Sequence, residues 1–299
     1  MTSTSVKPQS SPQSLADKAS AQLNAKPPSL FSPEFVQETL ALSRRLFIQL
    51  QRRPSTLIAG IVQPLMWLLL FGALFKNVPQ GMFGVSQSYG QFLSAGVIVF
   101  TAFSGALNAG LPVMFDREFG FLNRLLVAPL ASRFSIVLAS AIFITTLSLI
   151  QTAAIMGLSY ALGAGLPNVL GLGIVVLIVL LLVLGVTALS LGLTFALPGH
   201  IELIAVIFVT NLPLLFASTA LVPLAFMPTW LQIVASLNPL SFAIEPIRYI
   251  YLHSDWTFSS IVMQAPWGNL SLGMTLLLLA GFDAIALVSI QRLLQRKLA

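Results

Sequence analysis

The sequence contains no cysteine and very little charge, and each absence excludes a class of protein. Without cysteine, the 299-residue chain has no disulfide, no thiolate metal site and no cysteine nucleophile. Charged residues make up only 8% of the chain, whereas soluble domains average about 25%. Hydrophobic residues make up 57%, and the mean hydropathy is +0.92. A chain this apolar cannot cover a globule with polar surface, so the composition predicts an integral membrane protein.

Recognisable catalytic and nucleotide-binding motifs are also missing. The sequence has no GxSxG elbow, no HExxH zinc motif and no GxxxxGK[ST] phosphate loop. The two histidines, His200 and His253, lie far apart and in no metal-binding spacing. We therefore expect no catalytic residue, no metal site and no enzyme activity in this chain by itself. The net charge of +6 does not indicate nucleic-acid binding, because the basic residues lie beside apolar segments.

Six apolar segments are long enough to cross about 30 Å of hydrocarbon, and they predict an all-α polytopic membrane protein. With the N-terminus inside, ten basic residues beside the spans fall in cytoplasmic segments and two in outer segments, which is the positive-inside pattern. Both termini are then cytoplasmic. Pro112 predicts a bend in the second span, and neighbouring helices must satisfy the backbone groups that it frees. The predicted spans are 56–75, 92–115, 135–162, 169–197, 203–222 and 270–290.

Two N-terminal regions precede the spans. Residues 1–30 are rich in Ser, Gln and Pro and predict a disordered cytoplasmic tail, with an organelle transit peptide as the alternative. Residues 31–53 predict an amphipathic helix with Ser32 as N-cap, which Pro54 ends. We expect this helix to lie in the membrane interface; a surface helix without a partner is the alternative. Its polar face holds Glu34, Glu38, Arg45, Gln49 and Arg52, with Arg44 beside them, and its apolar face holds Val36, Leu40, Phe47 and Leu50.

A charged segment, residues 116–133, separates the second and third spans. Each charge would cost roughly 2.5–3.5 kcal/mol at the bilayer centre, so the segment must lie in water or against a protein in water. Apolar residues alternate with the charges at near-helical spacing and predict a short amphipathic helix, which Pro129 closes. Such a helix fits a docking element for a cytoplasmic partner; a solvated loop on the lipid headgroups is the alternative. The charges are Asp116, Arg117, Glu118, Arg124 and Arg133, and the apolar residues are Phe119, Phe121, Leu122, Leu125, Leu126 and Val127.

The region 54–299 is expected to form one six-helix membrane domain, whose outer segment, 223–269, is unusual. Much of that segment is too apolar for a free loop, so we expect short re-entrant helices in the outer leaflet before the last span. Glu245 and Arg248 are three residues apart, so they can pair and lower the cost of burial. Asp283 is the one acidic residue within the last span, and it is a functional proton site, a polar helix–helix contact or an interfacial group that water reaches.

These features together resemble the permease subunits of ABC-2-type exporters, a family that includes drug-resistance, nodulation-factor and polysaccharide export permeases with cyanobacterial and plastid relatives. The similarity runs from about Phe31 to the C-terminus. Family members typically have an interface helix, a Glu-x-Gly motif followed by Pro and a basic residue after the second span, and Pro-x-Trp, Asn-Pro and an acid before Arg in the outer segment. The matching residues are Glu118, Gly120, Leu122, Leu125, Leu126, Pro129 and Arg133 inside and Pro228, Trp230, Asn238, Pro239, Glu245 and Arg248 outside.

The resemblance implies that a separate cytoplasmic ABC ATPase binds ATP and Mg²⁺ and powers export. Two permease copies, or this chain and a paralogue, would pair with two ATPase subunits in the lipid of the membrane. The interface helix would aid coupling through Glu38, Arg44, Arg45 and Arg52. The residues expected to couple to the ATPase are Arg117, Glu118, Phe119, Gly120, Phe121, Leu122, Arg124, Leu125, Pro129 and Arg133.

The sequence also gives expectations for the substrate, for the membrane in which the protein lies and for alternative functions. Uncharged spans and aromatic residues near the outer segments favour an amphiphilic or lipid-linked substrate. The expected location is a bacterial plasma membrane, with a thylakoid or plastid membrane as alternatives. A secondary carrier or channel that uses Asp283 and a membrane scaffold without transport activity are the alternative functions.

Overall fold

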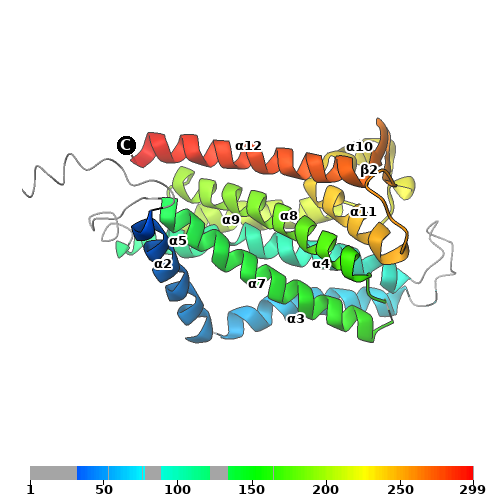
Figure 1. Ribbon diagram of the computed structural model, residues 1–299, viewed down its shortest axis with the longest axis horizontal. Helices are drawn as coiled ribbons and strands as arrows, with labels where there is room; N and C mark the ends of the chain where they lie inside the picture. The colour runs from blue at the N-terminus through cyan, green and yellow to red at the C-terminus, as the bar shows by residue number, and fades with distance from the viewer. Residues whose placement is uncertain are drawn as a thin grey trace, which may run out of the picture.

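Long helices that lie side by side make up most of the chain (Figure 1). The computed structural model describes residues 32–52, 54–75, 77, 89–121, 134–163 and 165–298. In place of the fifth expected span, 203–222, the structure has α9 (His200–Phe216), which is only 17 residues long. The described residues therefore include five membrane-length helical stretches rather than six. They are Leu57–Leu74, Tyr89–Glu118, Ser135–Ala161, Val169–Ala196 and Leu272–Leu293.

The centre of the bundle is α8 (Val169–Ala196), which contacts α4 (Tyr89–Leu107), α7 (Phe134–Ala161) and α12 (Leu272–Leu298). Most residues of α4 are buried, whereas α3 (Pro54–Leu74) exposes many of its leucine and isoleucine side chains. Lipid is as apolar as these side chains, so their exposure carries no penalty on a membrane-facing surface. The bundle thus has α4 and α8 as inner helices and α3 as an outer one.

The second expected span is broken near Pro112, as the sequence predicts. α4 ends at Leu107, and α5 (Gly110–Glu118) begins after a two-residue turn that starts at Asn108. A proline ring clashes with the carbonyl group four residues earlier, which here belongs to Asn108. The break therefore lies where the proline requires it. It makes α5 a separate short helix, and the charged residues lie at the end of that helix.

The helix α2 (Pro33–Arg52) lies across one end of the bundle and packs against α7 (Figure 1). Ser32 is its N-cap, because the Ser32 hydroxyl accepts a hydrogen bond from the amide of Phe35 at 3.2 Å. Val36 and Leu40, the first two residues of the expected apolar face, are exposed. Two small polar residues are buried instead, and each hydroxyl donates to the carbonyl four residues earlier, which permits close packing. The buried face is Phe35, Thr39, Ser43 and Leu46.

The outer segment forms short helices, as expected, but also a β-hairpin that was not expected. The hairpin pairs Met263 with Leu270 and Gln264 with Asn269 in antiparallel register and leads directly into α12. It lies with α10 and α11 at the end of the bundle opposite α2 and α5 (Figure 1). The elements of this segment are η1 (Leu224–Phe226), α10 (Thr229–Leu237), α11 (Pro239–Leu252), β1 (Ile261–Ala265) and β2 (Gly268–Ser271).

Candidate functional site

Three consecutive charged residues at the end of α5, Asp116, Arg117 and Glu118, form a cluster that we call the charged corner. Asp116 accepts hydrogen bonds from both terminal nitrogens of Arg45 in α2, at 2.7 and 2.8 Å. Such a bidentate pair fixes orientation as well as distance. The Arg45 guanidinium also lies over the ring of Phe121, 3.9 Å from its centroid. Asp116 therefore fixes α2 to the end of α5.

Arg117 binds the C-terminal end of α8. Its Nη1 donates to the carbonyl of Thr194 at 2.5 Å, and its Nη2 donates to the carbonyls of Leu197 and Pro198 at 2.7 and 2.6 Å. The last carbonyl groups of a helix have no partner within the helix and carry partial negative charge. A guanidinium with several donors in one plane suits this end, so Arg117 acts as a cap supplied by another helix.

Glu118 binds the N-terminal end of α9. One of its carboxylate oxygens accepts a hydrogen bond from the amide of His200, and the other lies 2.5 Å from His200 Nδ1. His200 is the first residue of α9, where backbone amides lack partners and the helix dipole favours a negative group. The charged corner thus connects α5 to α2, to the end of α8 and to the start of α9 through three adjacent side chains.

Hydroxyl groups of α8 hold the joint between α4 and α5 that precedes the charged corner. The Ser190 hydroxyl donates to the carbonyl of Leu107 at 2.6 Å and accepts from the amide of Gly110 at 2.9 Å. The Thr194 hydroxyl lies 3.0 Å from the carbonyl of Gly110 and donates to it. These bonds satisfy backbone groups that the helix break frees, as a bend inside a membrane requires.

The chain turns immediately after the charged corner, and from residue 122 onward the helix expected within 116–133 lies outside the described residues. Asp116–Glu118 are the last turn of α5, and Gly120 has φ of 76°, which a side chain would disfavour. Phe119 is 78% exposed, so it is available for contact with another protein. The expected residues Leu122, Arg124, Leu125, Pro129 and Arg133 lie outside the described residues.

The four residues expected to act in α2 have different surroundings. Arg45 reaches the charged corner, whereas Arg44 and Arg52 are exposed. Within the described residues, neither Arg44 nor Arg52 has an ion-pair partner. Glu38 is half-buried.

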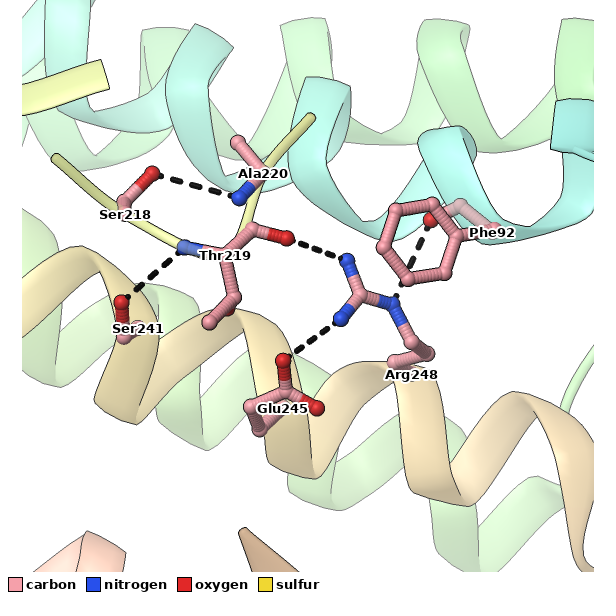
Figure 2. A network of polar contacts seen from close by, with 7 residues as sticks. All are labelled: Phe92, Ser218, Thr219, Ala220, Ser241, Glu245 and Arg248. Atoms are coloured by element: carbon pink, nitrogen blue, oxygen red, sulfur yellow. Dashed lines mark hydrogen bonds and ion pairs between the residues drawn. The ribbon is translucent and has the colours of Figure 1, made fainter. Parts of the chain in front are cut away.

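A second polar network lies at the opposite end, around Arg248 of α11 (Figure 2). Arg248 is 5% exposed and donates to the Glu245 carboxylate at 2.6 Å and to the carbonyl of Thr219 at 2.7 Å. Its guanidinium also lies over the ring of Phe92, 3.7 Å from the centroid. Burial lowers the pKa of Arg248, and the nearby Glu245 charge acts in the opposite direction. The pairing predicted from the three-residue spacing is therefore confirmed.

Asn238 connects the start of α11 to the end of α9. Its side-chain oxygen accepts from the amide of Leu240, and its side-chain nitrogen donates to the carbonyls of Leu214 and Ala217 at 2.8 and 2.6 Å. Pro239 follows it as the first residue of α11, a position that suits proline.

The other two residues expected in the outer segment lie at the start of α10. Pro228 is the N-cap of this helix, and Trp230 lies on it with 67% of its surface exposed. The structure therefore joins Glu245 with Arg248 and places Asn238 at a neighbouring helix joint.

Asp283 lies in α12 against α8 and is only 7% exposed. It packs on Gly185, where any side chain would collide with the Asp283 carboxylate and the ring of Phe282. Among the described residues, no group donates a hydrogen bond to Asp283 Oδ1.

The sequence alone did not indicate several residues of these sites. Ser190 and Thr194 are the clearest case. A signal for them is present, because two hydroxyl groups four residues apart in an apolar span lie on one face of the helix as a polar stripe. His200 lies in no metal-binding spacing, and its contact with Glu118, 82 residues away, carries no sequence signal. Thr219 acts through its backbone carbonyl, for which the sequence carries no signal.

The apolar bundle, its polar networks at the two ends and its membrane-length helices define a polytopic integral membrane protein. The chain belongs to the ABC-2 type transporter family, whose model matches residues 37–252. It is thus a transporter permease subunit, and permeases of this family generally work with a cytoplasmic ABC ATPase.

Named relatives agree with this assignment. The chain is 56% identical over 271 residues to transport permease ycf38 of Porphyra purpurea. The matched residues cover 91% of this chain and 93% of the relative. The chain is 53% identical over 261 residues to ycf38 of Cyanophora paradoxa, with 87% and 90% covered. It is 28% identical over 222 residues to the doxorubicin resistance ABC transporter permease protein DrrC of Mycobacterium tuberculosis, with 72% and 76% covered.

Proposed function

We propose that this chain is the membrane subunit of an ATP-driven exporter, with a separate cytoplasmic subunit that hydrolyses ATP. The charged corner carries the proposal: Asp116, Arg117 and Glu118 connect the segment expected to bind the ATPase to three helices of the bundle. The membrane-length helices and the family membership give the transport role its context.

Movement of the ATPase would pass through the charged corner into the bundle. A displacement of α5 moves α2 through Arg45, the end of α8 through Arg117 and the start of α9 through Glu118. All three contacts involve a charged group, so they are short and directional and resist sliding. The α4–α5 joint, which Ser190 holds against α8, lets α5 tilt while α4 stays packed in the bundle.

The remaining assignments complete the proposal. α9 acts as a sixth, short membrane helix; at 1.5 Å per residue its 17 residues reach roughly 26 Å. Both chain termini are cytoplasmic, and α2 lies in the inner membrane interface. The position of α2 and of the end of α12 at the same end of the bundle supports these two assignments (Figure 1). A second permease copy completes the pathway for an amphiphilic or lipid-linked substrate. The membrane is a bacterial plasma membrane or a thylakoid or plastid membrane.

Replacing Phe119 with aspartate should reduce co-purification of the ATPase roughly tenfold or more. Phe119 is exposed, so the change leaves the fold intact but places a charge where an apolar anchor is expected, and such anchors dominate interfaces. The measurement is a mild-detergent pull-down of tagged protein from its native membrane, with quantification of partners that carry a Walker motif.

The matched control is Leu166→Asp. Leu166 is 49% exposed, and it precedes α8 at the end opposite the charged corner. This variant should retain as much ATPase as the unaltered chain. If Phe119→Asp retains the ATPase as well as Leu166→Asp does, docking does not use this surface.

A second candidate function, a secondary carrier, follows from the buried carboxyl group of Asp283. A buried acidic group in a membrane helix is a common proton site, and Oδ1 of Asp283 has no hydrogen-bond donor among the described residues. Under this function Asp283→Asn would abolish pH-dependent flux in proteoliposomes. Under the exporter function, which we favour, the variant keeps ATP-driven transport and shows no loss of pH-dependent flux.

A further inference from the structure

A groove of about 750 Å³ lies beside the Arg45–Asp116 pair, between α2, α5 and α7. Its walls are largely apolar, with Leu111 and Phe115 from α5 and Phe143 from α7, and Arg52 lies on the α2 side. The volume falls within the roughly 300–1,000 Å³ of small-molecule sites. Apolar walls with a basic edge are the form expected of a site for an amphiphile.

The basic edge has more positive charge than its neighbours balance. A smaller hollow of about 370 Å³ on α2 shares Gln49 and Arg52 with the groove and is also lined by Arg44 and Arg45. Asp116 pairs with Arg45, whereas Arg44 and Arg52 are exposed and have no ion-pair partner in the part of the chain that the structure describes. The two arginines therefore favour an anion at this edge.

The exposed face of α2 points to a lipid rather than a soluble protein as the source of that anion. Val36, Leu40 and Ile48 are 47%, 60% and 36% exposed, and they share one row of positions, four residues apart, with Arg44 and Arg52. Apolar side chains mixed with arginines on one exposed face are typical of a helix in the membrane interface. The same arginines then lie at the depth of the lipid phosphates.

We propose that this groove binds one anionic phospholipid. Its phosphate lies against Arg44 and Arg52, and one acyl chain enters the groove past Leu111 and Phe115. Arg45 stays with Asp116, so the lipid and the charged corner use different arginines of α2. The lipid thereby holds α2 against α5 by a second contact, and the site requires no ATPase.

Lipid selectivity tests the proposal directly. The purified chain is reconstituted in nanodiscs with equal phosphatidylglycerol and phosphatidylcholine, extracted in mild detergent, and its bound lipids are counted by native mass spectrometry. Retention of phosphatidylglycerol should fall roughly fivefold for Arg44→Gln or Arg52→Gln and about 25-fold for both, since each arginine contributes about 1 kcal/mol to anionic-lipid attraction. Leu50→Trp should also lower retention by filling the groove without a change of charge.

The matched control is Arg292→Gln, which removes one positive charge from an exposed position of α12. It should retain phosphatidylglycerol like the unaltered chain. Equal retention in the Arg44→Gln/Arg52→Gln variant, or an equal loss in Arg292→Gln, overturns the proposal. A photoreactive residue in place of Gln49 gives a second test: crosslinks to phospholipid support the proposal, and crosslinks to another protein, a second copy or residues 122–133 overturn it.

Discussion

Replacing Arg117 with alanine is expected to lower the free energy of unfolding by about 3 kcal/mol and to reduce ATP-driven transport more than tenfold. The guanidinium donates to three carbonyl groups at the end of α8, and hydrogen bonds to a charged group contribute about 1.5–3 kcal/mol each when well buried. Arg117 is only half-buried, so the sum is discounted for solvent. The measurements are thermal unfolding in detergent, with a fall in Tm of roughly 6–10 °C, and transport in proteoliposomes with the ATPase.

Two further variants separate capping from charge. Arg292→Ala removes a positive charge from an exposed position of α12 and should melt like the unaltered chain. Arg117→Lys keeps the charge, but a single ammonium group cannot reproduce the planar fork that reaches three carbonyls. It should recover less than half of the lost stability. A difference in Tm of about 1 °C is taken as the precision of such a measurement. If the Tm of Arg117→Ala lies within that range of the control, this end of α8 needs no cap.

The charged corner illustrates what a sequence indicates and what it leaves open. The low overall charge makes the cluster at 116–118 conspicuous, and it predicts that these residues lie outside the hydrocarbon. Their partners were not predictable, because Arg45, Thr194 and His200 are 71, 77 and 82 residues from the side chains they meet. Helix periodicity describes one element at a time, whereas these contacts depend on how separate helices pack.

The orientation of α2 and the β-hairpin show a second limit of what sequence periodicity can predict. The apolar pattern of α2 selects Val36 and Leu40, yet they are exposed, because periodicity does not distinguish an apolar face that packs on protein from one that could face lipid. Thr39 and Ser43 are buried because their hydroxyls bond to their own helix. The hairpin strands span only five and four residues, so their alternation is too short to distinguish from a helical turn.

Replacing Arg248 with methionine is expected to be the most damaging single change, at about 3–5 kcal/mol of unfolding free energy. Removing one partner of a buried ion pair leaves the other charge without compensation, and the Glu245 side chain is only 15% exposed. The carbonyl of Thr219 and the ring of Phe92 lose their contacts as well. Thermal unfolding in detergent, and the yield of folded protein from the membrane, measure the effect.

The double variant Glu245→Leu/Arg248→Met distinguishes loss of an ion pair from loss of shape. An apolar pair of similar volume leaves no uncompensated charge, so the double variant should be more stable than Arg248→Met alone by about 1–3 kcal/mol. Arg248→Lys should stay close to Arg248→Met, because an ammonium cannot bind Glu245 and Thr219 together while lying flat on the Phe92 ring. If Glu245→Leu and Arg248→Met, measured singly, sum to the destabilisation of the double variant, the ion pair contributes no coupling. The joint between α11 and the chain after α9 would then depend on packing and on the Asn238 hydrogen bonds, which these variants leave intact.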